Sequence, residues 1–180
     1  MMSTSDRIHL LRMPAMLVTL ATLAIAADQP GIRATLVPQN ERQPAADFVL
    51  RDASGKTATL KDYTGKVVLL DFWATWCTGC KQEIPWFSEF QKKYGADGFA
   101  MVGVSLDDGG WKVLKPFLAE AKIPYRMLLG DDPMAKRYGI RNLPDTFLID
   151  RQGKVAAMYR AGIVDKDDVD ANIRTILDRR

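Results

Sequence analysis

Both cysteines of this 180-residue chain lie in one short stretch, FWATWCTGCK at 72–81. Cys77 and Cys80 are three positions apart, so at the start of a helix they would share one face and could form a disulfide with little backbone movement. The first of them would lie where unpaired backbone N–H groups and the helix dipole favour an anion. We therefore expect Cys77 to be the attacking thiolate in disulfide exchange and Cys80 to be the resolving thiol.

The first 26 residues have the pattern of an export signal. Arg7 and Arg12 precede an apolar run that ends in small residues, with Ala24 and Ala26 in an A-x-A arrangement. An uncleaved membrane anchor is the alternative, although the run is shorter than the roughly 20 apolar residues that a spanning helix needs. We interpret residues 1–26 as a signal peptide that directs the chain to the periplasm or another extracytoplasmic compartment, where disulfides persist.

Other uses of the cysteine pair are less well supported. A structural staple between residues so close in sequence would constrain the unfolded chain little. The only histidine, His9, lies in the expected signal, so the mature chain lacks the histidine of Cys-His nucleophiles and of most zinc and copper sites. Two thiolates alone leave a zinc site half empty but could hold copper(I) in linear geometry. We expect no metal and no cofactor, and keep a copper(I) carrier as an alternative.

Composition and charge limit the organisation and the partners. The net charge is +3 and the basic residues are scattered, which argues against nucleic-acid binding. The length suits one domain with a real core, and we expect a monomer. Residues 27–43 are polar and punctuated by prolines, so we interpret them as a linker, followed by a domain at 44–180.

Strands and helices alternate along this domain. A hairpin is predicted over 48–60, buried strands over 67–73 and 99–107, a short strand at 125–129 and a closing hairpin over 145–160. Helices are predicted over 81–94, 109–121, 132–138 and 165–177, with Pro85 expected to kink the first and Pro116 to interrupt the second. This order favours an α/β fold with a central mixed β-sheet flanked by helices.

Two segments carry a family resemblance: VVLLDFWATWCTGCKQEIP at 67–85 and GIRNLPDTFLIDRQGKV at 139–155. They resemble the thioredoxin superfamily and, within it, the exported TlpA/ResA-like thiol-disulfide oxidoreductases with an AhpC/TSA-Redoxin-like domain. The lead-in at 46–66 and the extra helix around 111–121 are similar to that branch rather than to plain thioredoxin. The resemblance implies a thioredoxin-like fold with an N-terminal β-hairpin and an inserted helix.

The resemblance also implies roles for the residues around the cysteine pair. Cys77 takes the place of the nucleophile and Cys80 that of the resolving cysteine. Pro144 matches the cis-proline that faces the disulfide and helps to hold the substrate chain, and Leu143 stands where the family tunes substrate contact. Trp76 would cover the site as an apolar wall.

The carboxylates near the pair set this chain apart. Asp71 matches a buried acid that helps proton transfer at the inner cysteine, and burial would raise its pKa toward neutrality; an acid hydrogen-bonded at a strand end is the alternative. The lysine that usually partners this acid is replaced around Gly103, and Gly79 replaces the usual proline before Cys80, so the start of the helix is expected to be looser.

Asp145 stands where cytochrome c maturation members carry Glu and could raise the pKa of the attacking thiol, unless it is a solvent-facing turn residue.

These features predict an exported thiol-disulfide oxidoreductase that acts as a reductant. Its partners would be disulfide-containing or thiol-bearing exported proteins, with apocytochrome c as one plausible client, and a membrane thiol electron donor. A thiol peroxidase is an alternative, although FWATWC lacks the proline- and threonine-bearing approach that a peroxidatic cysteine needs.

Overall fold

A seven-stranded sheet in the order β2-β1-β5-β4-β3-β6-β7 forms the centre of the molecule. The computed structural model describes residues 31–178, so the expected signal at 1–26 lies outside the described residues. Strands β3, β4 and β5 run parallel, and the remaining pairings are antiparallel. The strands are β1 (Val49–Asp52), β2 (Thr57–Thr59), β3 (Val67–Trp73), β4 (Phe99–Ser105), β5 (Arg126–Leu129), β6 (Asp145–Ile149) and β7 (Val155–Tyr159).

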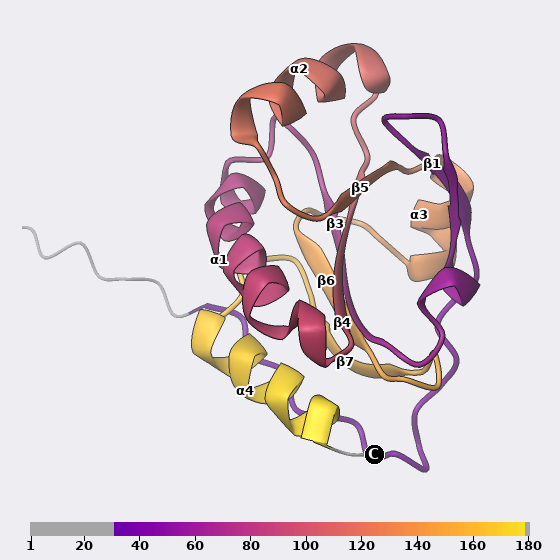
Figure 1. Ribbon diagram of the computed structural model, residues 1–180, viewed down its shortest axis with the longest axis vertical. Helices are drawn as coiled ribbons and strands as arrows, with labels where there is room; N and C mark the ends of the chain where they lie inside the picture. The colour runs from indigo at the N-terminus through magenta and orange to yellow at the C-terminus, as the bar shows by residue number, and fades with distance from the viewer. Residues whose placement is uncertain (1–30, 179–180) are drawn as a thin grey trace, which may run out of the picture.

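Helices cover both faces of this sheet. Helices α1, α2 and α4 lie on one face and α3 lies on the other (Figure 1). Within residues 31–178, none of the helices has the length and apolar content needed to cross a membrane. The helices are α1 (Thr78–Tyr94), α2 (Trp111–Ala121), α3 (Asp132–Tyr138) and α4 (Lys166–Asp178), with short 3-10 turns at Leu60–Tyr63 and Gly95–Asp97.

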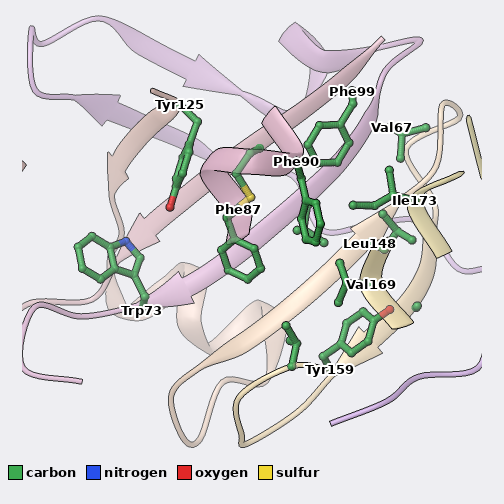
Figure 2. Packing of buried hydrophobic residues seen from close by; sticks show 14 of the residues in the cluster. Val67, Trp73, Phe87, Phe90, Phe99, Tyr125, Leu148, Tyr159, Val169 and Ile173 are labelled. Atoms are coloured by element: carbon green, nitrogen blue, oxygen red, sulfur yellow. The ribbon is translucent and has the colours of Figure 1, made fainter. Parts of the chain in front are cut away.

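The two central strands, β3 and β4, are buried along their whole length. Their apolar side chains alternate between two cores, because successive residues of a strand point to opposite faces. One core lies under α1, α2 and α4, and Figure 2 shows its aromatic part, with Trp73 from β3, Phe87 and Phe90 from α1, and Tyr125, the residue before β5. This arrangement confirms the expected mixed sheet, N-terminal hairpin and inserted helix.

The segment 31–46 is packed against the domain, which differs from the linker expected at 27–43. Val37 N–H donates to Ala156 O (2.8 Å) and Ala45 N–H donates to Gly153 O (2.9 Å), so the segment follows the edge strand β7. Ahead of them, Ala34 N–H donates to Asp168 at the start of α4 (3.0 Å). We call residues 31–46 the N-terminal strap. It covers backbone groups of a sheet edge that would otherwise be exposed.

A buried ion pair anchors the middle of the strap. Arg42 lies 3.0 Å from Asp150, and both side chains are 2% exposed. Asp150 also accepts hydrogen bonds from Gln152 N–H and Lys154 N–H in the turn between β6 and β7. Loss of one partner of such a pair leaves a buried, uncompensated charge, which is strongly destabilising.

We predict that Arg42→Ala lowers the free energy of unfolding by about 3 kcal/mol, because Asp150 is left buried without its cation. Arg33→Ala is the matched control: Arg33 also lies in the strap and pairs with Asp165 and Asp168, but its side chain is 69% exposed, so the loss should be below about 1 kcal/mol. Urea denaturation measures both. Equal losses would contradict the anchoring role of Arg42.

Candidate active site

The cysteine pair lies at the start of α1 and is closed as a disulfide. Cys77 is the N-cap of the helix, its Sγ accepts a hydrogen bond from Cys80 N–H (3.2 Å), and the two Cα atoms are 5.3 Å apart. Cys77 is 8% exposed and Cys80 is 1% exposed. The outer position and the helix end make Cys77 the residue of the two that an incoming disulfide reaches first.

A carboxylate holds the turn that leads into this helix. Asp107, which follows β4, accepts hydrogen bonds from both the N–H (3.0 Å) and the Oγ1 (2.6 Å) of Thr75, and from Ser105 Oγ (2.7 Å). These bonds tie the residues just before the cysteines to the end of the neighbouring strand. Trp76, the residue immediately before Cys77, has 66% of its surface exposed.

The Leu143–Pro144 segment, which was expected to contact the substrate, lies next to the cysteine turn. The Leu143–Pro144 peptide is cis, and β6 begins immediately after it. A Cβ built on Gly79 would lie 3.9 Å from Pro144 Cδ and only 3.1 Å from Ile163 Cγ1. Glycine at 79 therefore has a packing reason: Ile163, from the loop between β7 and α4, lies against the helix where another residue would place its side chain.

Asp145 is neither solvent-facing nor a free carboxylate beside the disulfide. It is 3% exposed; its Oδ1 accepts from Ala161 N–H (2.6 Å) and its Oδ2 accepts from Arg160 Nη1 (2.9 Å). Arg160 also donates to Tyr138 O (3.1 Å). We expected Asp145 to raise the pKa of the attacking thiol, and that effect requires an uncompensated negative charge. Arg160 instead supplies a counterion for Asp145. Both oxygens are engaged in holding the loop that follows β7.

Asp71 is buried in the middle of the sheet, on β3. It pairs in register with Gly103 of β4, and Thr146 Oγ1 donates to its Oδ1 (3.0 Å). Burial raises the pKa of Asp71 to about 7, against the opposing effect of the Thr146 hydrogen bond. The side chain of Met127 fills the space over Gly103, so the position of the usual lysine partner is closed.

A second buried acid, Glu83, was not among the predicted site residues. It is one turn beyond Cys80 on the buried face of α1 and is completely buried. Its Oε1 accepts from Val164 N–H (2.7 Å), and its Oε2 has no hydrogen-bond partner among residues 31–178. Burial, followed by the charge of Asp71, raises the pKa of Glu83 to about 9. The sequence signal was an acid on the same helical face as Cys80 and Phe87.

The structure thus brings most of the predicted residues together and adds two more. The cysteine pair, Trp76 and cis-Pro144 surround the start of α1, and Leu143 is partly buried beside them. Asp71 lies close enough to Glu83 to influence its ionisation. Glu83 and Ile163 join this site from α1 and from the loop before α4.

Comparison with known proteins assigns the family. The model of the AhpC/TSA family matches residues 42–158, so the chain belongs to this family. The thiol-disulfide oxidoreductase ResA of Geobacillus thermodenitrificans is 35% identical over 133 residues, which are 73% of this chain and 75% of that protein.

Solved structures agree with this assignment. A crystal structure from Chlorobium tepidum, assigned as a thiol:disulfide interchange protein DsbE, has a TM-score of 0.71 and 37% identity and covers 76% of this chain and 96% of that chain. The exposed lipoprotein thioredoxin Etrx1 of Streptococcus pneumoniae has a TM-score of 0.63 and 29% identity, with 72% and 99% covered. The fold is thioredoxin-like, and the chain is a thiol-disulfide oxidoreductase.

We predict that the free energy of unfolding of Glu83→Gln increases relative to that of the wild type as the pH rises. The folded state keeps Asp71 and Glu83 protonated to about pH 7 and 9, whereas the unfolded chain releases these protons near pH 4 to 5. The free energy of unfolding of the wild type therefore falls across this window, and the variant loses the Glu83 part of the fall.

Urea denaturation of the oxidised protein at pH 5, 7 and 9 measures this effect. Because one pKa unit corresponds to about 1.4 kcal/mol, the difference between Glu83→Gln and wild type should shift in favour of the variant by at least about 2 kcal/mol between pH 5 and pH 9. A packing effect of the amide is independent of pH and cancels in this comparison. Parallel curves for the two proteins would contradict the raised pKa of Glu83.

Proposed function

We propose that this thiol-disulfide oxidoreductase is exported and acts as a reductant of disulfides in extracytoplasmic client proteins. The observation that carries the proposal is the pair of buried acids, Asp71 and Glu83, behind a cysteine pair at a helix N-terminus. When Asp71 is ionised, its negative charge disfavours a nearby thiolate, so it limits the stabilisation of the reduced form by the helix. A pair whose reduced form gains little stabilisation gives up its electrons more readily.

The exchange proceeds through a mixed disulfide. The Cys77 thiolate attacks one sulfur of the client disulfide, and the other client sulfur leaves as a thiolate that takes up a proton. Cys80 then loses its proton and attacks the Cys77 sulfur, which breaks the mixed disulfide and releases the second client thiol. Two electrons pass to the client, and Cys77 and Cys80 end in the disulfide seen here. A membrane thiol electron donor returns the pair to its reduced form.

The two acids suit different parts of this reaction. A general base works best when its pKa is near the operating pH, and the pKa of Asp71, about 7, meets this condition. Asp71 is therefore our candidate acceptor for the proton of Cys80. Glu83, with its pKa raised to about 9, stays neutral at pH 7 and adds no second negative charge to the interior.

Export and the type of client rest on separate grounds. The pattern at 1–26 is that of a signal peptide, with a retained membrane anchor as the alternative. Exposed Trp76 and cis-Pro144 give an extended client chain a wall beside Cys77. Apocytochrome c is one candidate client, since its haem-attachment motif carries two cysteines.

We predict that Cys80→Ser traps client proteins. Without the resolving thiol, the mixed disulfide formed by Cys77 is not broken, so covalent adducts should accumulate on the variant in the cell that makes this protein. Non-reducing electrophoresis followed by mass spectrometry identifies the adducts. Cys77→Ser/Cys80→Ser is the matched control and should trap nothing. Equal labelling of both variants, or adducts only with proteins that stay in the cytoplasm, would contradict the proposed function.

We predict a reducing potential for the Cys77/Cys80 couple. Equilibration in dithiothreitol or glutathione buffers should give a value nearer to about −270 mV, as in thioredoxin, than to about −120 mV, as in the strong oxidant DsbA. A value near −120 mV would overturn the reductant assignment. Tight stoichiometric copper(I) binding without disulfide reduction would favour the carrier, and rapid peroxide turnover would favour a thiol peroxidase.

A further inference from the structure

The loop between β7 and α4, residues 160–165, connects the candidate site to the N-terminal strap. Asp145 binds the first part of this loop through Arg160 and Ala161 N–H. Ala161 has a φ of 58°, a left-handed conformation that a non-glycine residue keeps only when its surroundings hold it.

The second part of the loop contacts the first turns of α1. A Cβ on Gly79 would lie 3.1 Å from Ile163 Cγ1, and Val164 N–H donates to Glu83 at 2.7 Å. With Pro144 on the same side of Gly79, Ile163 forms one wall of the cysteine turn. The position of this loop relative to α1 therefore determines the shape of the surface that a client contacts next to Cys77.

The first two residues of the strap lie directly on this loop. Ile32 N–H donates to Ile163 O (2.7 Å), and Asp165 N–H donates to Ile32 O (2.9 Å). Through these two bonds, Ile32 pairs with Val164 in a parallel β-bridge. A Cβ on Gly31 would lie 2.5 Å from the backbone nitrogen of Asp165, so the two backbones are in close contact.

The contact between the strap and the loop is also specific at the side-chain level. A Cβ on Gly162 would lie 2.9 Å from Ile32 Cγ1 and 3.2 Å from its Cδ1. Gly162 is not among the glycines with positive φ, so an alanine there would be opposed by Ile32 and not by its own backbone. Strap and loop fit each other because position 162 has no side chain.

We propose that Gly31 and Ile32 are positioning residues for client binding: they hold the 160–165 loop against α1, so that Ile163 completes the wall beside Cys77 for an extended protein client. The inference rests on the proposed function for the identity of the client as a protein. The strap acts through the loop and touches neither cysteine, so a small disulfide, which needs only access to Cys77, does not depend on it.

The test enlarges the side chain at position 162 and then reduces the opposing side chain at position 32. Gly162→Ala should push the loop away from Ile32, and Ile32→Ala/Gly162→Ala should restore the fit by removing the opposing side-chain atoms. Arg33→Ala is the control within the strap, because it removes only the exposed ion pairs with α4 and with the last residue of the loop. Thermal unfolding of each variant establishes that it is folded.

The probes are an oxidised peptide with a Cys-Ala-Ala-Cys-His disulfide and the small aromatic disulfide DTNB, each reacted with the reduced protein. For Gly162→Ala we expect a KM for the peptide about fivefold higher, with kcat and the DTNB rate within twofold of wild type. The double variant should return KM to within twofold of wild type, and Arg33→Ala should leave it unchanged. An unchanged KM, equal losses on both probes, or no recovery in the double variant would overturn the inference.

Amide hydrogen exchange gives a second readout that does not depend on electron transfer. In Gly162→Ala the exchange of residues 161–164 should be at least tenfold faster and that of α4 unchanged, with recovery in the double variant. Unchanged exchange in the loop overturns the inference whatever the activity. A wild-type protein that reduces neither probe contradicts the proposed function instead, and the exchange data then still decide whether the strap holds the loop.

Discussion

The contact between the first turns of α1 and the 160–165 loop is the constraint on which the site depends. The absence of a side chain at Gly79 lets Ile163 lie against the helix, and one turn later Glu83 accepts the Val164 N–H. The disulfide, the cis-Pro144 segment and the loop thus meet at one point. A Cβ at position 79 would meet Ile163 Cγ1 at 3.1 Å, so the Ile163 side chain would have to shift by a few tenths of an ångström to admit it.

The apolar layer that stabilises the fold also determines the chemistry of the acids. Trp73, Phe87 and Phe90 pack between the sheet and α1, and this packing excludes water from the two carboxyl groups nearby. Excluding water from a carboxylate disfavours its charged form, so the pKa of Asp71 and that of Glu83 rise. The stability of the core and the raised pKa of both acids therefore have one origin, and the acids reduce stability at alkaline pH because their charged forms are buried.

Local patterns were sufficient to predict most of the fold. The apolar runs at 67–73 and 99–107 predicted the buried strands β3 and β4, and the spacing of Phe87, Phe90 and Tyr94 predicted the buried face of α1. Pro116 was misleading: α2 continues through it, where an interruption was expected, and α1 likewise continues through Pro85. A proline removes one hydrogen bond, and burial of the surrounding apolar face can outweigh that loss.

Contacts between distant residues could not be predicted from the sequence. The strap has the composition of a linker, and only the structure reveals that its backbone groups pair with β7 and with the 160–165 loop. Asp145 was expected near the disulfide, but its counterion, Arg160, is fifteen residues away on the far side of a hairpin. Glu83 could have been noticed as an acid on an apolar face, although its partner, Val164, is 81 residues away.

Gly103, which replaces the usual lysine, affects the pKa of Asp71. Because Met127 fills that space, no cation opposes the effect of burial on Asp71 at this position, and its pKa stays at about 7, as the proposed proton transfer from Cys80 requires. Ionisation of Asp71 in turn raises the pKa of Glu83, so two buried charges do not form together at neutral pH. The pair of acids can therefore accept one proton near neutral pH, which is the number that the proposed resolving step releases from Cys80.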